Sequence, residues 1–289
     1  MKDYIALTKP RITWLVVTTT GIGYFFGLPA GTFRWLSWTS WIPLLITLLG
    51  TALIAGGTFA LNQWYEREAD FKMRRTAGRP LPGGRLTASS ALIFGSAVSL
   101  AGFATLALAV NPLAGLLGLF TLVSYLFIYT PLKQRSSLST VVGALPGAMP
   151  PLIGYAASTG TLTPEAWALF AILFIWQFPH FLAIAWMYRE DYSRAGILML
   201  PVVEPDGRST SRQIVMYAST LIPVSLFPTL LGMTGRIYLV GALMLGLWFL
   251  YAGVRVAFDR TILRARRVLL VSVIYLPLIY GLMLFDRPL

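Results

Sequence analysis

The sequence of 289 residues contains no cysteine, only one histidine (His180) and few charged residues. The absence of cysteine excludes disulfides, thiolate metal sites and a cysteine nucleophile. Charged residues make up 12% of the chain, whereas a typical soluble protein has roughly 25%. Hydrophobic residues make up 56%, and the mean hydropathy is +0.70. This composition excludes an ordinary soluble protein and indicates a polytopic membrane protein.

Apolar runs recur along the whole chain at the length of about 20 residues that an α-helix needs to cross the hydrocarbon core. We predict an all-α fold in one domain, 1–289, with nine transmembrane helices. Prolines inside the runs predict kinked helices around a central cavity that opens to the cytoplasmic side. The predicted spans are 12–30, 41–63, 88–110, 113–130, 138–158, 164–188, 211–231, 236–256 and 267–286.

Lysine and arginine are unevenly divided between the two sides of this predicted bundle. One side carries only Arg34, Arg236 and Arg287, and the rest of the 23 Lys and Arg lie on the side of the N-terminus. Cytoplasmic loops carry the excess of these residues, so the N-terminus is predicted to be cytoplasmic. The net charge of +12 then reflects topology and attraction to anionic lipid headgroups, and it does not indicate nucleic-acid binding.

The start of the chain resembles neither a cleavable signal nor an Arg- and Ser-rich transit peptide, so we expect the inner membrane of a bacterium. Two long polar connections, 64–87 and 189–210, both lie on the predicted cytoplasmic side, and each follows an acidic cluster. Their spacing suggests two related halves, about 12–130 and 138–256, with the last span additional. Glycines within the spans are expected to pack the helices closely.

The first acidic cluster ends the second predicted span. Asn62, Glu66 and Asp70 are four residues apart and share one face if the helix continues. An amide oxygen and two carboxylates are hard ligands that suit Mg²⁺. Glu68 points in another direction, and we expect it to pair with a neighbouring Arg or Lys.

Cations follow this cluster directly. Mg²⁺ bridges the oxygens of a diphosphate while arginines hold them in bidentate contacts, and this sequence offers both kinds of group. Arg75 and Arg79 share a face if the helix continues. The alternative, a basic loop flanking the membrane, would not explain acids at a spacing of four. The predicted diphosphate-binding residues are Lys72, Arg75, Arg79, Lys133 and Arg189.

The second acidic cluster, Glu190 and Asp191, ends the sixth predicted span. Asp191 is the expected metal ligand from the second half, with Arg189 beside it, whereas Glu190 faces another way. Lys133 follows the fourth span at the same predicted side of the membrane, where it either reaches the diphosphate or marks the topology. The predicted catalytic residues are Asn62, Glu66, Asp70, Lys133 and Asp191, and all of them except Lys133 are predicted to bind Mg²⁺.

Several strings resemble known proteins. The run Asn62-x-x-x-Glu66-x-x-x-Asp70 resembles the first acidic motif of the UbiA-type intramembrane prenyltransferases. Glu66 stands where that superfamily usually has Asp, and Tyr188 stands where many relatives carry a carboxylate, which leaves the number of metal ions open. The strings that resemble its protohaem IX farnesyltransferase branch are 62–66, 73–81, 129–133, 176–181 and 191–202.

This resemblance implies a UbiA-type bundle and an Mg²⁺-dependent farnesyl transfer. Farnesyl diphosphate would donate its farnesyl group to a vinyl group of haem b, and water would add to the same vinyl group. The products would be haem O and diphosphate, in the biosynthesis of haems O and A. Candidate physical partners would be haem A synthase and a terminal oxidase assembly. No residue pattern in the sequence distinguishes between these two partners. Two alternatives stay open: a UbiA-type enzyme that prenylates a quinone precursor or another tetrapyrrole, and a membrane carrier.

His180 lies about two turns inside the sixth predicted span, near Trp176. Ionisable groups at that depth are candidates for function. With haem as acceptor, His180 and Trp176 become candidate haem-binding residues, through the iron, a propionate or a proton relay. The alternative is a neutral histidine bonded to the backbone carbonyl that Pro179 frees.

Overall fold

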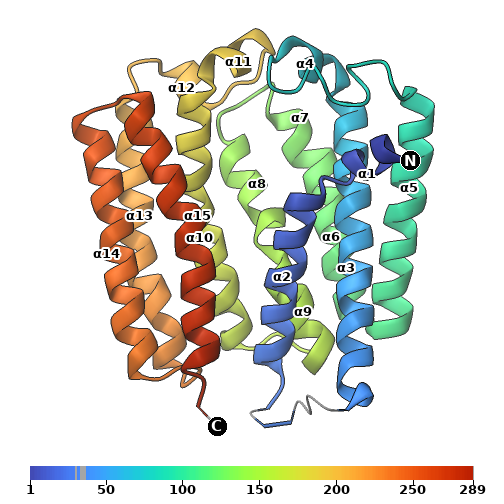
Figure 1. The fold of residues 1–289 in the computed structure, drawn as a ribbon, viewed down its shortest axis with the longest axis vertical. Coiled ribbons are helices and arrows are strands. Elements are labelled where there is room, and N and C mark those ends of the chain that lie inside the picture. Colours follow the sequence, from blue (N-terminus) through green and yellow to red (C-terminus); the bar gives the residue numbers. More distant parts are fainter. Residues whose placement is uncertain (30, 33–36, 289) are drawn as a thin grey trace.

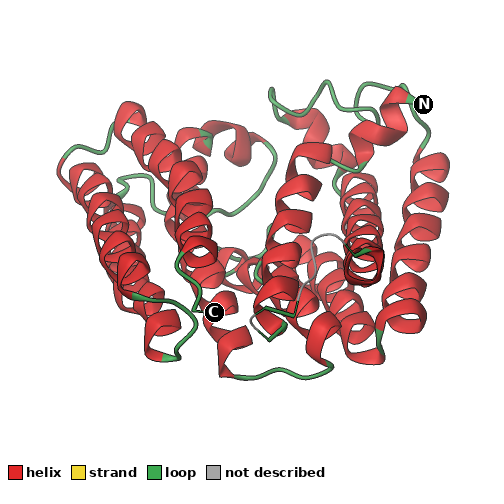
Figure 2. Cartoon of the chain, turned by 60° about the horizontal axis from the view of Figure 1, so that its bottom comes forward, coloured by secondary structure: helices red, strands yellow, loops and turns green. Residues whose placement is uncertain are grey.

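The computed structural model describes residues 1–29, 31–32 and 37–288. These residues form helices joined by turns, with no strand among them (Figures 1 and 2). The long helices stand side by side, and the short helices α4 and α11 lie at one end of the bundle (Figure 1). Arg34, one of the three basic residues assigned to the opposite side, lies outside the described residues.

Ten helical segments build the bundle, and four short helices flank it in the described part of the chain. The bundle consists of α2 (Pro10–Gly27), α3 (Trp38–Tyr65), α5 (Ala88–Ala104) continued by η1 (Thr105–Val110), α6 (Pro112–Val123) continued by η2 (Ser124–Tyr129) and α7 (Thr130–Leu132), α8 (Ser139–Gly147), α9 (Met149–Thr159), α10 (Pro164–Met187), α13 (Arg208–Leu230), α14 (Arg236–Phe258) and α15 (Ile262–Phe285). The short helices are α1 (Lys2–Leu7), α4 (Arg67–Lys72), α11 (Arg189–Arg194) and α12 (Leu200–Val203).

Eight helical stretches in the described residues are long and apolar enough to cross a membrane. They correspond to eight of the nine predicted spans. The remaining prediction, 12–30, corresponds to α2, which carries Arg11 and three consecutive threonines and is not among those eight. In Figure 1, α2 nevertheless lies alongside the long helices.

The helix that contains the last predicted span is longer than that span, which was predicted to begin at about 267. Helix α15 already begins at Ile262, where the side chain of Thr261 accepts a hydrogen bond from the backbone N–H of Arg264 (3.4 Å). This side-chain cap satisfies one of the free N–H groups at the helix start. Arg264, Arg266 and Arg267 therefore belong to the helix itself.

The predicted span 138–158 is broken into α8 and α9 at Ala148. Pro150 and Pro151 supply no backbone N–H, so they leave helix carbonyls without their usual donors. The side chain of Gln177, on α10, donates to the carbonyl of Ala144 (2.9 Å). This carbonyl also accepts from the backbone N–H of Ala148 (3.1 Å), so the Gln177 bond adds a polar contact between α10 and the end of α8.

Helices α2 and α9 approach each other closely at two glycines. A Cβ atom on Gly23 would lie 2.0 Å from the carbonyl oxygen of Pro151, and one on Gly154 would lie 1.8 Å from that of Thr20. No side chain fits at either position. Helix α9, from the second predicted half, therefore packs tightly on α2 from the first, while the duplication of the halves stays a prediction.

Two residues after α15 join helices at the end opposite α4 and α11. The carboxylate of Asp286 accepts a hydrogen bond from the backbone N–H of Tyr238 at the start of α14 (2.7 Å). Arg287 donates to the carbonyl of Phe25 (2.7 Å) and to that of Leu28, at the end of α2. The chain after α15 thus ties the beginning of α14 to the end of α2.

Candidate active site

The two acidic clusters, remote in sequence, lie at the same end of the bundle. Figure 1 shows α4 and α11 next to each other there. Ala69 and Met73, in and directly after α4, share a buried apolar cluster with Ala185, Ala195 and Ile197. The apolar contact holds the segments 66–73 and 185–199 together.

The expectation of one continuous helix through the first cluster is wrong at Glu66. This residue ends α3 and precedes α4, with φ −88° and ψ 9°. The backbone bonds from Glu66 N–H to Asn62 O (2.9 Å) and from Asp70 N–H to Glu66 O (2.8 Å) nevertheless continue across the junction. The four-residue spacing is therefore kept, and Asn62 and Asp70 are each only 1% exposed.

Asp70 has one paired and one unpaired oxygen. Its Oδ2 accepts a hydrogen bond from Nη1 of Arg79 (2.6 Å). Its Oδ1 is buried and has no hydrogen-bond partner among the described residues. Because a buried polar atom without a partner is costly, this oxygen is positioned for a ligand.

Glu66 and Lys133 form a half-buried ion pair, with Nζ 2.8 Å from Oε1. Burial alone would raise the pKa of Glu66, but the charges of Lys133 and Lys9 outweigh it, so the pKa is lowered. Burial alone would lower the pKa of Lys133, but Glu66 and the nearby tyrosines raise it well above its usual range. Both groups are therefore charged, and each stabilises the other.

Lys9 is a site residue that the sequence analysis missed. Its Nζ donates to Oδ1 of Asn62 (3.3 Å) and lies 5.1 Å from the ring centre of Phe59. Burial, Arg79 and Lys133 lower the pKa of Lys9 to about 7. Among the described residues, Lys9 is the only non-glycine with positive φ, at 47°. This left-handed turn between α1 and α2 brings the ammonium to the acidic cluster, and in the sequence it looks like an ordinary basic flank.

The residues of the first cluster fit a magnesium ion. The donors are an amide oxygen from Asn62 and carboxylate oxygens from Glu66 and Asp70, one of them unpaired. Oxygen ligands of this kind suit Mg²⁺. The described residues contain no group of three or more His, Cys, Asp or Glu that could hold a metal ion. The predicted site thus depends on the amide of Asn62, and the part of Asp191 in it stays a prediction.

In the second cluster, Asp191 is buried and forms an ion pair with Arg194, three residues further along α11. Arg194 was not among the predicted residues. Arg189, which was, donates instead to the carbonyl of Trp186 (2.9 Å), and its guanidinium lies 4.5 Å from that ring centre. Glu190 is exposed, as expected for a residue that faces another way.

A cleft of about 410 Å³ opens at the second acidic cluster, and four arginines contribute to its wall, two of them from the segment just after α4. Asn62, Glu66 and Asp70 do not line it. Arg75 donates to the hydroxyl of Tyr192 (3.0 Å) and lies over the rings of Tyr188 and Tyr192. It therefore bridges the two segments. The residues around the cleft are Arg74, Arg75, Met187, Tyr188, Arg189, Glu190, Asp191, Arg194 and Ile262.

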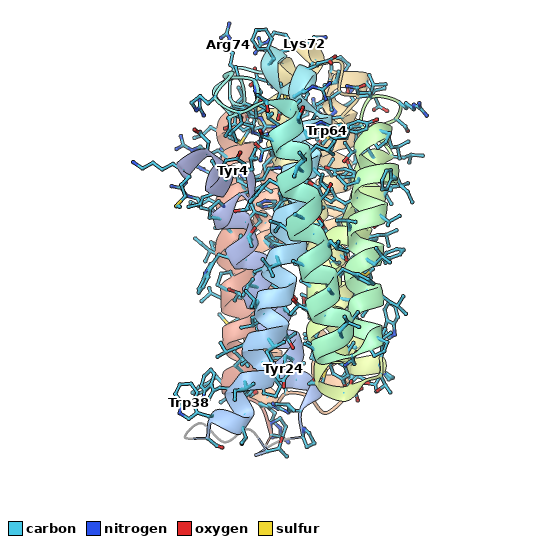
Figure 3. The ribbon with its side chains drawn as sticks, turned by 90° about the vertical axis from the view of Figure 1, so that its right-hand side faces the viewer. Tyr4, Tyr24, Trp38, Trp64, Lys72 and Arg74 are labelled. Carbon is cyan, nitrogen blue, oxygen red and sulfur yellow. The ribbon has the colours of Figure 1, made fainter. Side chains whose placement is uncertain are left out.

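One expectation for the cations after α4, a shared helix face for Arg75 and Arg79, is wrong. The segment after Lys72 consists of turns, so Arg75 and Arg79 do not share a helix face. Arg79 pairs with Asp70, whereas Arg75 contacts Tyr192. Lys72 is exposed at the outer surface of this end (Figure 3) and does not line the cleft.

His180 and Trp176 lie away from the acidic clusters, within α10. Their rings are stacked with centres 4.8 Å apart. Nδ1 of His180 lies 2.7 Å from Oγ of Ser272, on α15. The alternative partner predicted for His180, a carbonyl freed by Pro179, is therefore wrong.

The sequence profile of the UbiA prenyltransferase family matches residues 16–277. The chain belongs to this family. It is a multi-pass membrane protein, as the UbiA fold and its apolar helices require. This family assignment confirms the resemblance drawn from the acidic motif.

Two curated relatives of this chain carry the same name. A protoheme IX farnesyltransferase of Solibacter usitatus is 68% identical over 291 residues, covering 100% of this chain and 99% of that protein. One of Koribacter versatilis is 47% identical, covering 99% of this chain and 94% of that protein.

Solved UbiA structures share the fold. A digeranylgeranylglyceryl phosphate synthase superposes with a TM-score of 0.79 at 17% identity, over 99% of this chain and 97% of that one. A UbiA homologue from Archaeoglobus fulgidus, bound to DMAPP and Mg²⁺, gives a TM-score of 0.68 at 17% identity, over 97% of this chain and 99% of that one.

Proposed function

We propose that this protein transfers the farnesyl group of farnesyl diphosphate to a vinyl group of haem b. The bond between C1 of farnesyl and the diphosphate oxygen breaks, and C1 forms a bond to the vinyl carbon. Water adds to the neighbouring carbon and loses a proton, so haem O and diphosphate are the products. The observation that carries the proposal is the cluster of Asn62, Glu66 and Asp70 among cations, in a chain 68% identical to a protoheme IX farnesyltransferase.

Asn62, Glu66, Asp70 and Asp191 are the residues that would hold magnesium. When bound, Mg²⁺ would neutralise charge on the departing diphosphate. The unpaired Oδ1 of Asp70 supports this assignment, because it is a buried carboxylate oxygen that no donor of the described residues satisfies. The Mg²⁺ bound to the Archaeoglobus homologue is consistent with it.

Cationic side chains would bind the diphosphate itself. Arg79, Lys133 and Lys9 are the nearest to the carboxylates of the first cluster. Arg75 and Arg189 line the cleft beside them, and Lys72 contributes charge from the surface. Preorganised cations of this kind stabilise the negative charge that develops as the C1–O bond breaks.

Aromatic rings would stabilise the allylic cation left behind. Tyr125 contacts both Phe59 and Tyr129 edge to face, with ring centres 6.1 and 5.0 Å apart. Lys133 Nζ lies 4.4 Å from the centre of the Tyr129 ring, so this aromatic group adjoins the diphosphate site. The negative faces of such rings attract cations. The reaction needs no protein nucleophile, in agreement with the absence of cysteine.

The proposed setting is the inner membrane of a bacterium, with the N-terminus and the acidic clusters facing the cytoplasm. The excess of Lys and Arg at the end that carries α4 and α11 supports this orientation. Haem A synthase and a terminal oxidase assembly are candidate recipients of the product, and co-purification from crosslinked membranes tests each.

Membranes containing the protein, incubated with haem b, farnesyl diphosphate and Mg²⁺, should yield a porphyrin whose mass has risen by one farnesyl group and one water. An unchanged porphyrin together with a prenylated quinone would instead establish the alternative acceptor. Transport of either substrate without a product would indicate a carrier.

Asp70→Ala should abolish this turnover, because it removes the unpaired oxygen, and a thermal melt checks that the variant is folded. Glu68→Ala is the matched control, since the side chain of Glu68 is 85% exposed and should not affect the rate. Retained activity in Asp70→Ala would refute the metal assignment.

A further inference from the structure

Three side chains form a polar contact between α10 and α15 in an otherwise apolar region. Nε1 of Trp176 donates to the backbone carbonyl of Ser272 (2.9 Å). Nδ1 of His180 lies 2.7 Å from Oγ of the same serine. The indole and the imidazole are nearly parallel, with 23° between their planes. The contact with Ser272 therefore fixes the imidazole within its plane, and the stacked indole of Trp176 covers one of its faces.

The hydrogen bonds of Ser272 determine which nitrogen of His180 carries the proton. The Ser272 hydroxyl donates to the carbonyl of Leu269 (2.6 Å), which can only accept. A hydroxyl has a single hydrogen, so toward His180 its oxygen must accept, and Nδ1 must carry the N–H. Nε2 is then left with a free lone pair, and no hydrogen bond to it occurs among the described residues.

A neutral imidazole with its Nδ1–H fixed by an oxygen and its Nε2 free is the usual arrangement of a histidine metal ligand. A purely structural histidine in an apolar region would be expected to use both nitrogens, since an unpaired polar atom is costly there. His180 is half-buried and so remains partly accessible. The arrangement points to a metal ion that Nε2 can coordinate.

We propose that Nε2 of His180 is an axial ligand to the iron of the haem acceptor, and that Ser272 is a positioning residue that fixes the tautomer. This inference rests on the proposed function, which supplies an iron porphyrin as substrate. His180 lies about two helical turns from the end of α10 that leads into the acidic cluster of α11. The same helix therefore connects the proposed iron ligand to the segment that carries Asp191.

The first test is spectroscopic and requires no turnover. The purified wild-type protein in lipid nanodiscs, titrated with ferric haem b, should show the magnetic circular dichroism of a histidine-ligated haem. His180→Gly should lose this signature, and millimolar imidazole should restore it. Metal-free protoporphyrin IX should bind both proteins equally, because it offers no iron to coordinate.

Two outcomes of this test would overturn the proposal. One is an unchanged haem spectrum in His180→Gly. The other is an equal loss of affinity for haem and for metal-free porphyrin, because His180 would then act through packing alone. Imidazole rescue guards against a folding defect, since a misfolded variant would not recover the signature.

Ser272→Ala tests the positioning role. It should weaken haem binding by about 10- to 100-fold, the usual cost of losing the partner of a ligating histidine. Ser225→Ala is the matched control, because Ser225 is also a buried serine bonded to α15, through the hydroxyl of Tyr275 (2.7 Å), and lies outside this group. Equal haem affinity in Ser272→Ala and the wild type would remove Ser272 from the proposal.

Failure of this inference and failure of the proposed function are distinguishable. If the wild-type protein forms no farnesylated haem but prenylates another acceptor, the proposed function fails. If farnesylated haem forms while His180→Gly leaves the haem spectrum unchanged, only the axial ligation fails.

Discussion

At the scale of single residues, the candidate site neutralises its own charges in pairs. Asp70 pairs with Arg79, Glu66 with Lys133, and Asp191 with Arg194. Each pair joins a proposed metal ligand to a cation suited to phosphate. Under the proposed function, substrate binding would exchange these partners: the carboxylates would turn to the metal and the cations to the diphosphate.

Lys133→Met should lower both stability and activity. The side chains of Lys133 and Glu66 are 13% and 12% exposed, and breaking such a pair leaves a charge with too little solvation, at a cost of about 3 kcal/mol. The double variant Lys133→Met, Glu66→Gln should recover the melting temperature, because no charge remains unpaired. It should not recover turnover, because the proposed leaving-group cation is absent. A double variant as active as the wild type would contradict the role of both residues.

Lys9→Met should raise the KM for farnesyl diphosphate by at least about tenfold, because hydrogen bonds to charged groups are worth about 1.5–3 kcal/mol. The KM for haem should stay the same, since the ammonium of Lys9 lies beside Asn62 in the first cluster. Lys2→Met removes an exposed lysine of the same terminal segment and serves as the control for net charge. Steady-state kinetics with each substrate varied in turn provide the comparison.

At the scale of helices, close backbone approach fixes how the bundle packs. The glycine contact between α2 and α9 holds a helix of the first predicted half against one of the second. Small residues at such crossings let helices pack through van der Waals contact, which drives helix association in lipid.

Gly23→Ala should destabilise the protein by about 1–3 kcal/mol, the usual cost of overpacking. Its added methyl would lie 2.0 Å from the carbonyl oxygen of Pro151. Gly21→Ala, in the same helix, is the matched control, because its methyl would meet only Leu48 at an ordinary 3.7 Å. Thermal melts followed by size-exclusion chromatography compare the two. Equal melting temperatures would show that α2 can move away from α9.

At the scale of the whole molecule, the acidic clusters gather at one end and α3 begins at the other. Figure 3 shows Lys72 and Arg74 at the first end and Trp38 at the opposite end. Since the chain has no cysteine, single cysteines can report on each end without any background reaction.

A membrane-impermeant maleimide should label Glu68→Cys in inverted vesicles only, and Trp38→Cys in right-side-out vesicles only. Glu68 has a side chain that is 85% exposed, and Trp38 is 75% exposed, so both positions are accessible. The opposite labelling pattern would reverse the proposed orientation and place the site outside the cytoplasm.

The sequence was sufficient to predict the helical spans and the acidic clusters, because both depend on local patterns. Apolar length defines a span, and carboxylates at a spacing of four remain close along a helical path even where Glu66 interrupts the helix. Contacts between distant segments were not predictable in this way. Lys9 reaches Asn62, 53 residues away in the chain, through a left-handed turn, and Arg75 reaches Tyr192 across the two acidic segments.

The residues that follow α15 also limit how the chain can be engineered. Asp286 satisfies a free N–H group at the beginning of α14, and Arg287 satisfies free carbonyls at the end of α2. Trimming these two residues would expose unsatisfied backbone groups on two helices at once. Affinity tags and fluorescent fusions are therefore better joined to Met1, which is 98% exposed, or added beyond an intact Asp286 and Arg287.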